Sequence, residues 1–197
     1  MINQETDLHV CADAEDFRQA LAAVKEHAPD LAVVDLTLKD IGGLELVKHL
    51  ESSNPDLPVL VLSMHDETLY AERALRAGAK GYIMKQEGTD KLVTAIRTIL
   101  RGEIYVSEKM SSKMLGQYVG RRPRASGILM ETLSHRELEV FELIGRGQGT
   151  RQIAERLCIS IKTVESHREH IKVKLKLKNA NELIQHATQW IVNERAD

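Results

Sequence analysis

The stretch LAVVDLTLKD at residues 31 to 40 begins as an apolar, strand-forming run and delivers a carboxylate, Asp35, at the end of that run. Similar short apolar runs occur at residues 8 to 12, 58 to 63 and 81 to 85. Segments with helical spacing of apolar residues separate them, at 14 to 28, 43 to 53, 66 to 77 and 88 to 101. Strands that are apolar on both faces and alternate with helices predict a parallel sheet covered on both sides, an α/β fold.

Polar side chains stand at the ends of three of these runs. Asp35, Ser63 and Lys85 each end one of them. Ligands of open α/β sheets bind outside the carboxyl ends of the strands, so we expect these three side chains to converge. Any one of them alone is weak evidence, because a strand-end aspartate is commonly a loop cap and a lysine is usually solvated. Their spacing carries the prediction of a site.

Charge is distributed unevenly along the 197 residues. Residues 1 to 100 hold 10 Lys and Arg against 17 Asp and Glu, a balance of −7, and residues 101 to 197 hold 17 against 12, a balance of +5. Within residues 146 to 178 there are 9 basic and 3 acidic residues. The sequence therefore joins an acidic module to a basic one that is suited to a polyanion.

The chain divides into two expected domains. We assign residues 1 to 105 to the α/β domain, 106 to 128 to a linker that collects Ser, Gly, Pro and Arg, and 129 to 197 to an all-α domain of four helices. No stretch approaches the about 20 apolar residues that a membrane-spanning helix needs. We expect a cytoplasmic protein with no membrane partner.

The C-terminal domain has the layout of a helix-turn-helix. TRQIAERL (150 to 157) is a short helix, a tight turn ends at Ser160, and a longer helix follows at 161 to 177. Ser160 is a candidate N-cap, and an apolar stripe at Val164, Ile171 and Leu175 can be buried. The opposite face is free, and in a helix-turn-helix the exposed N-terminal part of the second helix enters the major groove of DNA.

Residue chemistry divides the expected DNA contacts. Lysine and arginine suit phosphates, Glu165 and Glu169 can accept from the amino group of cytosine, and Ser166 can serve either kind of base. A solvated charged helix face is the alternative interpretation. The residues predicted to contact DNA are Thr150, Arg151, Lys162, Thr163, Glu165, Ser166, Arg168, Glu169 and Lys172.

From the Leu-Ser-His-Arg-Glu opening at 133 to 137 to the Lys-Thr-Val-x-x-His pattern at 162 to 167, this domain resembles the DNA-binding domain of the LuxR (NarL/FixJ) family. The resemblance implies a homodimer on DNA that pairs through the last helix, residues 181 to 194. Ordinary packing within the domain is the alternative role for the apolar stripe of that helix. Its members are Leu183, Ala187, Trp190 and Ile191.

The first domain, with Asp35, Ser63 and the run Gly78 to Lys85, resembles the receiver domain of two-component response regulators. The resemblance implies that a partner histidine kinase phosphorylates Asp35, while Ser63, Tyr82 and Lys85 respond to the phosphate. The chemistry agrees, because a carboxylate can attack a phosphoryl group, and lysine and serine can bind its oxygens.

Receivers also have parts that this sequence does not contain. They begin with a central strand and two acidic residues that hold Mg²⁺ together with the phosphoacceptor, in a sheet of order 2-1-3-4-5. We therefore expect a flavodoxin-like receiver without its first strand and most of its first helix. Asp35 and the backbone of Thr37 remain as a partial Mg²⁺ site, so phosphorylation is expected to be weak. Either the start codon has been assigned too late or the regulator is deficient.

Three functions follow from these patterns. The first is a DNA-binding regulator of a two-component phosphorelay, and the second is a phosphorylation-independent regulator whose receiver serves for docking or dimerisation. The third is a phosphatase with an aspartate nucleophile, which needs a second acid two residues later. Thr37 stands there, so we expect no enzymatic turnover.

Overall fold

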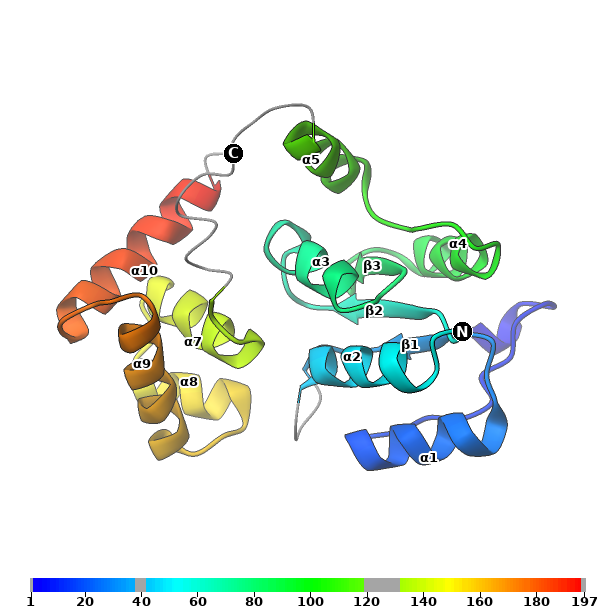
Figure 1. Ribbon diagram of the computed structural model, residues 1–197, viewed down its shortest axis with the longest axis horizontal. Helices are drawn as coiled ribbons and strands as arrows, with labels where there is room; N and C mark the ends of the chain where they lie inside the picture. Colours follow the sequence, from blue (N-terminus) through cyan, green and yellow to red (C-terminus); the bar gives the residue numbers. More distant parts are fainter. Residues whose placement is uncertain (1, 38–41, 119–131, 196–197) are drawn as a thin grey trace. The chain divides into compact units, whose positions relative to one another are not determined.

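The computed structural model describes residues 2 to 37, 42 to 118 and 132 to 195, which belong to two compact units that divide between residues 121 and 122 (Figure 1). The first unit contains η1 (Ile2–Gln4), α1 (Phe17–His27), β1 (Ala32–Val34), α2 (Gly43–Ser53), β2 (Val59–Ser63), α3 (Glu67–Arg76), β3 (Gly81–Met84), α4 (Thr89–Leu100) and α5 (Glu108–Tyr118). The second contains α7 (His135–Gly145), α8 (Thr150–Leu157), α9 (Ile161–Lys174) and α10 (Ala180–Arg195).

A parallel sheet of order β1-β2-β3 forms the centre of the first unit. Val33 lies opposite Leu60, and Val61 lies opposite Tyr82. Right-handed crossovers in one direction place α2 and α3 on the same face of such a sheet, and both lie in front of the strands in Figure 1. The strands expected within 31 to 35, 58 to 63 and 81 to 85 are thus confirmed.

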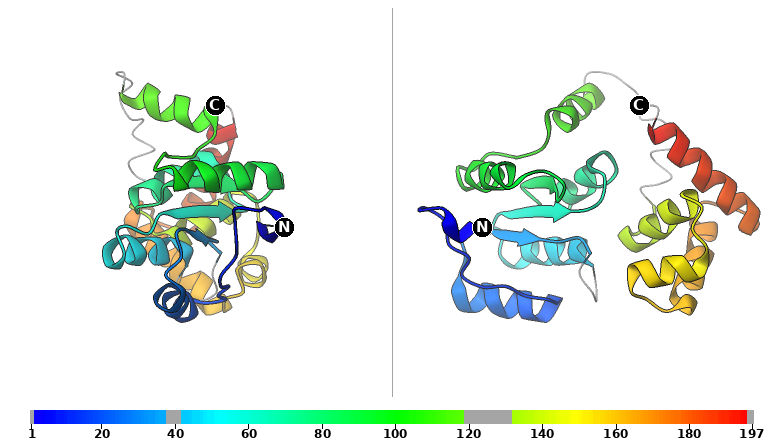
Figure 2. Two further views of the ribbon diagram at one scale, coloured as in Figure 1. Left: turned by 90° about the vertical axis from the view of Figure 1, so that its right-hand side faces the viewer. Right: turned by 180° about the vertical axis from the view of Figure 1, so that it is seen from behind.

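The other face of the sheet is covered by α4 (Figure 2). Its buried residues repeat at helical spacing, at Leu92, Ala95, Ile96 and Ile99, so they form one apolar stripe along the helix. This stripe packs against Leu60 of β2 and Ile83 of β3. The packing of α4 therefore fixes β2 and β3, the strands that lead to Ser63 and Lys85.

The expected strand at 8 to 12 is not formed. These residues have no regular structure, and Leu8 instead packs with Ile2 against the core beneath α4. The guanidinium of Arg97 on α4 binds Glu5 at 2.8 Å and Asp7 at 2.6 Å. Apolar character alone predicted the strand, but a strand needs a ladder partner, and here the acidic residues that precede the run tie it to a helix.

The expected linker at 106 to 128 is also partly wrong. Residues 108 to 118 form α5, and its Met110 is fully buried. Ser107 caps this helix by accepting the backbone N–H of Met110 at 3.0 Å, and its hydroxyl donates to Glu67 of α3 at 2.5 Å. Because residues 108 to 118 are mostly polar, no helix was predicted there, although its few apolar residues are sufficient to pack it on the first unit. Residues 119 to 128 of the predicted linker lie outside the described residues.

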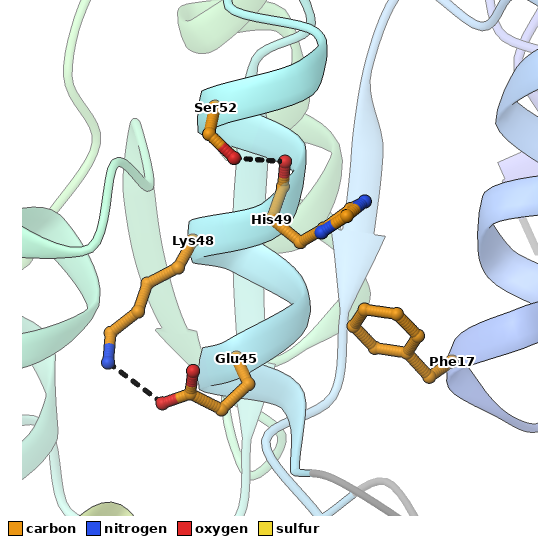
Figure 3. A pocket seen from close by; sticks show the side chains of 5 residues that line it. All are labelled: Phe17, Glu45, Lys48, His49 and Ser52. Carbon is orange, nitrogen blue, oxygen red and sulfur yellow. Dashed lines mark hydrogen bonds and ion pairs between the residues drawn. The ribbon is translucent and has the colours of Figure 1, made fainter.

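A shallow groove separates α1 from α2 (Figure 3). The ring of Phe17 meets that of His49 edge to face, with centroids 5.3 Å apart, and Lys48 pairs with Glu45 at 2.8 Å. None of the predicted site residues lines this groove.

The second unit is a helical domain whose turns follow the predicted caps. Ser134 and Glu137 form the expected capping box at the start of α7, and Ser160 caps α9. Cys158, between α8 and α9, has a left-handed backbone with φ of 53°, which allows the tight turn. Val164, Ile171 and Leu175 form the buried stripe of α9, as expected.

Candidate functional site

The three polar strand ends lie at one edge of the parallel sheet. Asp35 directly follows β1, Ser63 is the last residue of β2, and Lys85 directly follows β3. The backbone N–H of Lys85 donates to the carbonyl oxygen of Ser63 at 2.7 Å, so these two strand ends are joined. The predicted convergence at the carboxyl edge is therefore present.

Asp35 and Lys85 form the centre of this edge. The ammonium of Lys85 donates to Oδ2 of Asp35 at 2.5 Å, and the backbone N–H of Thr37 donates to Oδ1 at 3.0 Å. Burial raises the pKa of the Asp35 carboxyl, but the hydrogen bonds from Lys85 and Thr37 outweigh it, and the pKa lies below its ordinary value. Asp35 is thus an ionised carboxylate, the form that can act as a nucleophile.

Ser63 and Tyr82 meet at a residue that sequence reasoning missed, His65. The hydroxyl of Ser63 accepts the backbone N–H of His65 at 3.1 Å, and the hydroxyl of Tyr82 donates to the carbonyl oxygen of His65 at 2.9 Å. The His65 ring lies 4.6 Å from that of Tyr70 on α3. Ser63 and Tyr82 are both buried, so this small network links the site to α3. The position of His65 two residues after Ser63 was its only signal in the sequence.

The residues around Asp35 fit a Mg²⁺ site poorly. Mg²⁺ prefers an octahedral shell of oxygens, usually with one or two carboxylates. Both Asp35 oxygens already accept hydrogen bonds, from Lys85 and from the N–H of Thr37. In the described part of the first unit, no group of three metal-ligating side chains includes Asp35. The side chains described at this edge therefore supply a phosphate-binding cation and a nucleophile, but not a metal shell.

The second candidate surface is the outward face of α9, with the start of α8 beside it. Lys162, Glu165, Ser166 and Glu169 are exposed on α9, and Arg151 is exposed on α8. The other predicted contacts are half-buried, namely Thr150, Thr163, Arg168 and Lys172. The helix-turn-helix thus presents a continuous charged face, while its apolar stripe is covered by the domain.

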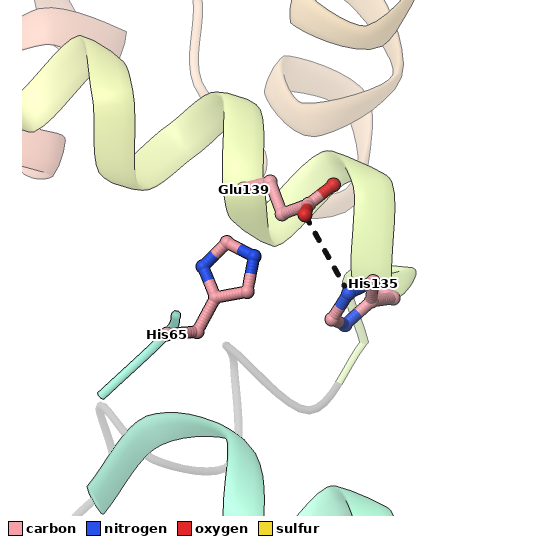
Figure 4. Close-up of side chains that lie close together, drawn as sticks. All are labelled: His65, His135 and Glu139. Carbon is pink, nitrogen blue, oxygen red and sulfur yellow. Dashed lines mark ion pairs between the residues drawn. The ribbon is translucent and has the colours of Figure 1, made fainter. Parts of the chain in front are cut away.

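A carboxylate of α7 holds α9 in place. Glu137 accepts from the ammonium of Lys174 at 2.6 Å and from the backbone N–H of Ser134 at 2.6 Å. Burial raises the pKa of Glu137, and the bonds from Lys174 and Ser134 outweigh it, so the pKa lies below its ordinary value. Lys174 is therefore engaged within the domain. Elsewhere on α7, Glu139 faces His135, one turn earlier in the helix, at 3.6 Å (Figure 4).

The apolar stripe of α10 that was predicted to serve dimerisation packs mainly within its own domain. Leu183 and Ala187 are fully buried and Trp190 nearly so, with the Trp190 ring centred 5.5 Å from that of Phe141 on α7. Gly145 approaches so closely that an added Cβ would lie 2.7 Å from Ile191. Leu183, Ala187 and Trp190 thus pack α10 against α7 of the same domain and leave little surface for a second copy, whereas Ile191 is half-buried. The exposed apolar residues of α10 are Ile184, at 44%, and Val192, at 57%.

Within the described ranges, no helix is both long and apolar enough to cross a membrane.

Comparisons with protein families match both units. Residues 1 to 97 match the response regulator receiver domain, and residues 131 to 187 match the luxR family of bacterial regulatory proteins. The oxygen regulatory protein NreC of Staphylococcus epidermidis is 38% identical over 95% of this chain and 88% of that protein. NreC of Staphylococcus carnosus is 37% identical over the same shares.

Solved structures show the same organisation. A LuxR-family two-component response regulator from Aurantimonas sp. is 33% identical, with a TM-score of 0.51, over 56% of this chain and 79% of that one. RcsB from Salmonella enterica serovar Typhimurium, bound to promoter rprA with the phosphomimetic BeF3−, is similar over 95% of this chain and 89% of that one, with a TM-score of 0.56. At 24% identity, RcsB supports the fold alone.

Proposed function

Because the chain belongs to the LuxR family of two-component response regulators, which bind DNA, we propose that phosphoryl transfer to Asp35 controls its DNA binding. The observation that supports this most directly is the Asp35 carboxylate held 2.5 Å from the Lys85 ammonium at the carboxyl edge of the sheet. A partner histidine kinase supplies the phosphoryl group.

The transfer uses groups that are already in place. An oxygen of Asp35 attacks phosphorus, the phosphorus–nitrogen bond of the kinase phosphohistidine breaks, and the histidine keeps the electron pair. The Lys85 ammonium can donate to the new phosphate oxygens, because a phosphoryl group adds three acceptor oxygens and about 1.5 to 2 negative charges. Receiver domains normally use Mg²⁺ for this chemistry, but no group of three metal-ligating side chains among the described residues includes Asp35, so no step here is assigned to a metal.

The Ser63, His65 and Tyr82 network can convert this charge into a change of shape. A phosphate on Asp35 competes with the backbone N–H of His65 for the Ser63 hydroxyl. If Ser63 turns toward the phosphate, the loop before α3 loses one of its anchors, while the Tyr82 hydroxyl bond to the His65 carbonyl remains. This is a two-state element of the kind that a local charge can bias.

DNA recognition is assigned to the outward face of α9 and the first turn of α8. Lysine and arginine residues there contact phosphates, and the residues at the N-terminal end of α9 reach base edges in the major groove. We assign this surface to Thr150, Arg151, Lys162, Thr163, Glu165, Ser166, Arg168, Glu169 and Lys172, and within it Glu169 is paired with Lys172. RcsB, which shares the fold, forms dimers on DNA in a solved structure, and a homodimer reading two half-sites is proposed here as well.

The test is a gel-shift titration with and without acetyl phosphate. We expect a fraction of the treated protein to gain the mass of one phosphoryl group and that fraction to bind DNA more tightly, and the Asp35→Asn variant to do neither. A mass increase that survives in D35N would remove Asp35 from the proposal.

A second function is favoured by the ion pair itself. Asp35 is already neutralised by Lys85, and in the described residues no group of three metal-ligating side chains includes it. A receiver locked in this way would serve as a docking or dimerisation module for a regulator that binds DNA without phosphorylation. Identical binding curves with and without the phosphodonor, together with an unchanged protein mass, would select this second function.

A further inference from the structure

The DNA-facing surface of α9 carries two carboxylates among its cations. Of the 3 acidic residues between 146 and 178, Glu165 and Glu169 are both exposed on this helix. The cap at Ser160 starts the helix at Ile161, so Glu165 lies in the second turn and Glu169 lies one turn later. A carboxylate in this position is repelled by DNA phosphates. A hydrogen-bond donor on a base edge can offset this cost.

The structure distinguishes the two carboxylates. Glu169 forms an ion pair with Lys172 at 2.9 Å, so much of its charge is balanced within the helix. Glu165 makes no ion pair and no hydrogen bond through its side chain to any residue between 132 and 195 that the structure describes. It is the carboxylate that faces solvent without a cation, and it lies closer to the end of α9 that enters the groove.

Few groups in the major groove can satisfy an unpaired carboxylate. A carboxylate only accepts hydrogen bonds, and the donors on base edges there are the amino groups of cytosine and adenine. In adenine the acceptor N7 lies beside the amino group and repels a carboxylate, whereas cytosine has no acceptor beside its amino group on this edge. We propose that Glu165 selects a cytosine within each half-site, while Glu169 is held by Lys172 and reads no base.

This inference rests on the proposed DNA recognition by α9. Its test begins with the full-length protein and a pool of random duplexes, from which bound sequences are selected and sequenced. We expect one position of the selected half-site to be cytosine. At that position the Glu165→Gln variant should lose about tenfold in preference for cytosine over the other bases, and should gain adenine, because glutamine can bond both N6 and N7 of adenine.

The Glu169→Gln variant is the matched control, since it makes the same charge change one turn later on the same face. Both variants should bind random-sequence DNA more tightly, but E169Q should keep the cytosine. If E165Q selects the same bases as the unaltered protein, the role of Glu165 is overturned and DNA recognition by α9 stands. If the unaltered protein enriches no sequence, base reading by this helix fails, and this inference fails with it.

Discussion

Asp35 is held at the sheet edge by donors from two separate segments, the Lys85 ammonium and the N–H of Thr37. These donors keep the carboxyl ionised although burial opposes ionisation. The neighbouring Ser63 and Tyr82 instead share His65, so Asp35 with Lys85 and Ser63 with Tyr82 form two hydrogen-bonded groups. At the scale of single residues, the site therefore separates the nucleophile from the switch.

Replacing Lys85 with methionine should raise the pKa of Asp35. The strongest opposing donor is lost while burial and the Thr37 hydrogen bonds remain, so the pKa is expected to rise. A carboxyl whose pKa is depressed in the folded state contributes stability above the unfolded pKa of about 3.9, and loses it as pH falls through the folded pKa. K85M should therefore lack this acid-sensitive contribution. Carbon-13 NMR titration of the Asp35 carboxyl measures the shift.

Lys80→Met is the matched control, because Lys80 precedes β3 at its other end and lies 4.0 Å from Glu51. It should leave the Asp35 titration unchanged. An Asp35 pKa that is equal in K85M and in the unaltered protein would show that Lys85 does not set it.

Helix α9 depends on α7 for its orientation. Glu137 closes the capping box of α7 and also binds Lys174 near the end of α9, so one side chain serves two elements. Lys174 looked available for a phosphate in the sequence, and the fold instead uses it to join two helices. At the scale of elements, part of the basic charge of the domain is structural.

The Glu137 and Lys174 side chains should be energetically coupled. Glu137→Gln keeps an oxygen that can accept the Ser134 N–H, so the capping box survives while the charge is lost. We expect E137Q and Lys174→Met each to lower the free energy of unfolding, and the double variant to cost less than their sum by about 0.5 to 3 kcal/mol. Urea unfolding followed by the fluorescence of Trp190, the only tryptophan of the chain, reports this domain.

Lys178→Met provides the comparison for this cycle, because the Lys178 side chain makes no ion pair in the second unit as described. Its effect should simply add to that of E137Q. Strict additivity of E137Q and K174M would show that the 2.6 Å contact contributes no stability.

The whole molecule joins an acidic receiver to a basic DNA-binding domain, and the proposed recognition of two half-sites requires two copies. The apolar stripe that the sequence offered for pairing is used inside each copy, where Trp190 packs on Phe141. The exposed Ile184 and Val192 remain on α10 as apolar residues that a second copy can cover. At this scale, the contact between copies is expected on a different face of α10 from the one predicted.

Ile184→Glu should weaken pairing without unfolding the domain. The side chain is 44% exposed, so a carboxylate there stays hydrated in the single copy but opposes an apolar contact with a second one. We expect a loss of cooperative binding to DNA with two half-sites, measured by sedimentation and gel shift. Leu183→Ala should instead destabilise the domain by about 2 to 5 kcal/mol, because Leu183 is fully buried. Unaltered cooperativity in I184E would exclude this face.

Local patterns determined much of this protein. The alternation of apolar strands and helices, the capping box at Ser134 and the N-cap at Ser160 were all readable, because each depends on a few neighbouring residues. Asp35 and Lys85 were also predictable as partners, since parallel strands bring their carboxyl ends to one edge. The linker helix α5 was missed because its apolar residues are too few to produce a strong period.

Only the tertiary structure decided which partner each surface takes. Leu8 packs against the core beside α4, where Arg97 binds Asp7, 90 residues away in the chain. The same kind of distant contact turned Lys174 toward Glu137, the stripe of α10 toward α7, and Tyr82 toward His65. The physical reason is that an apolar or charged residue specifies the kind of neighbour it needs, while the choice among several suitable neighbours depends on the packing of the whole unit.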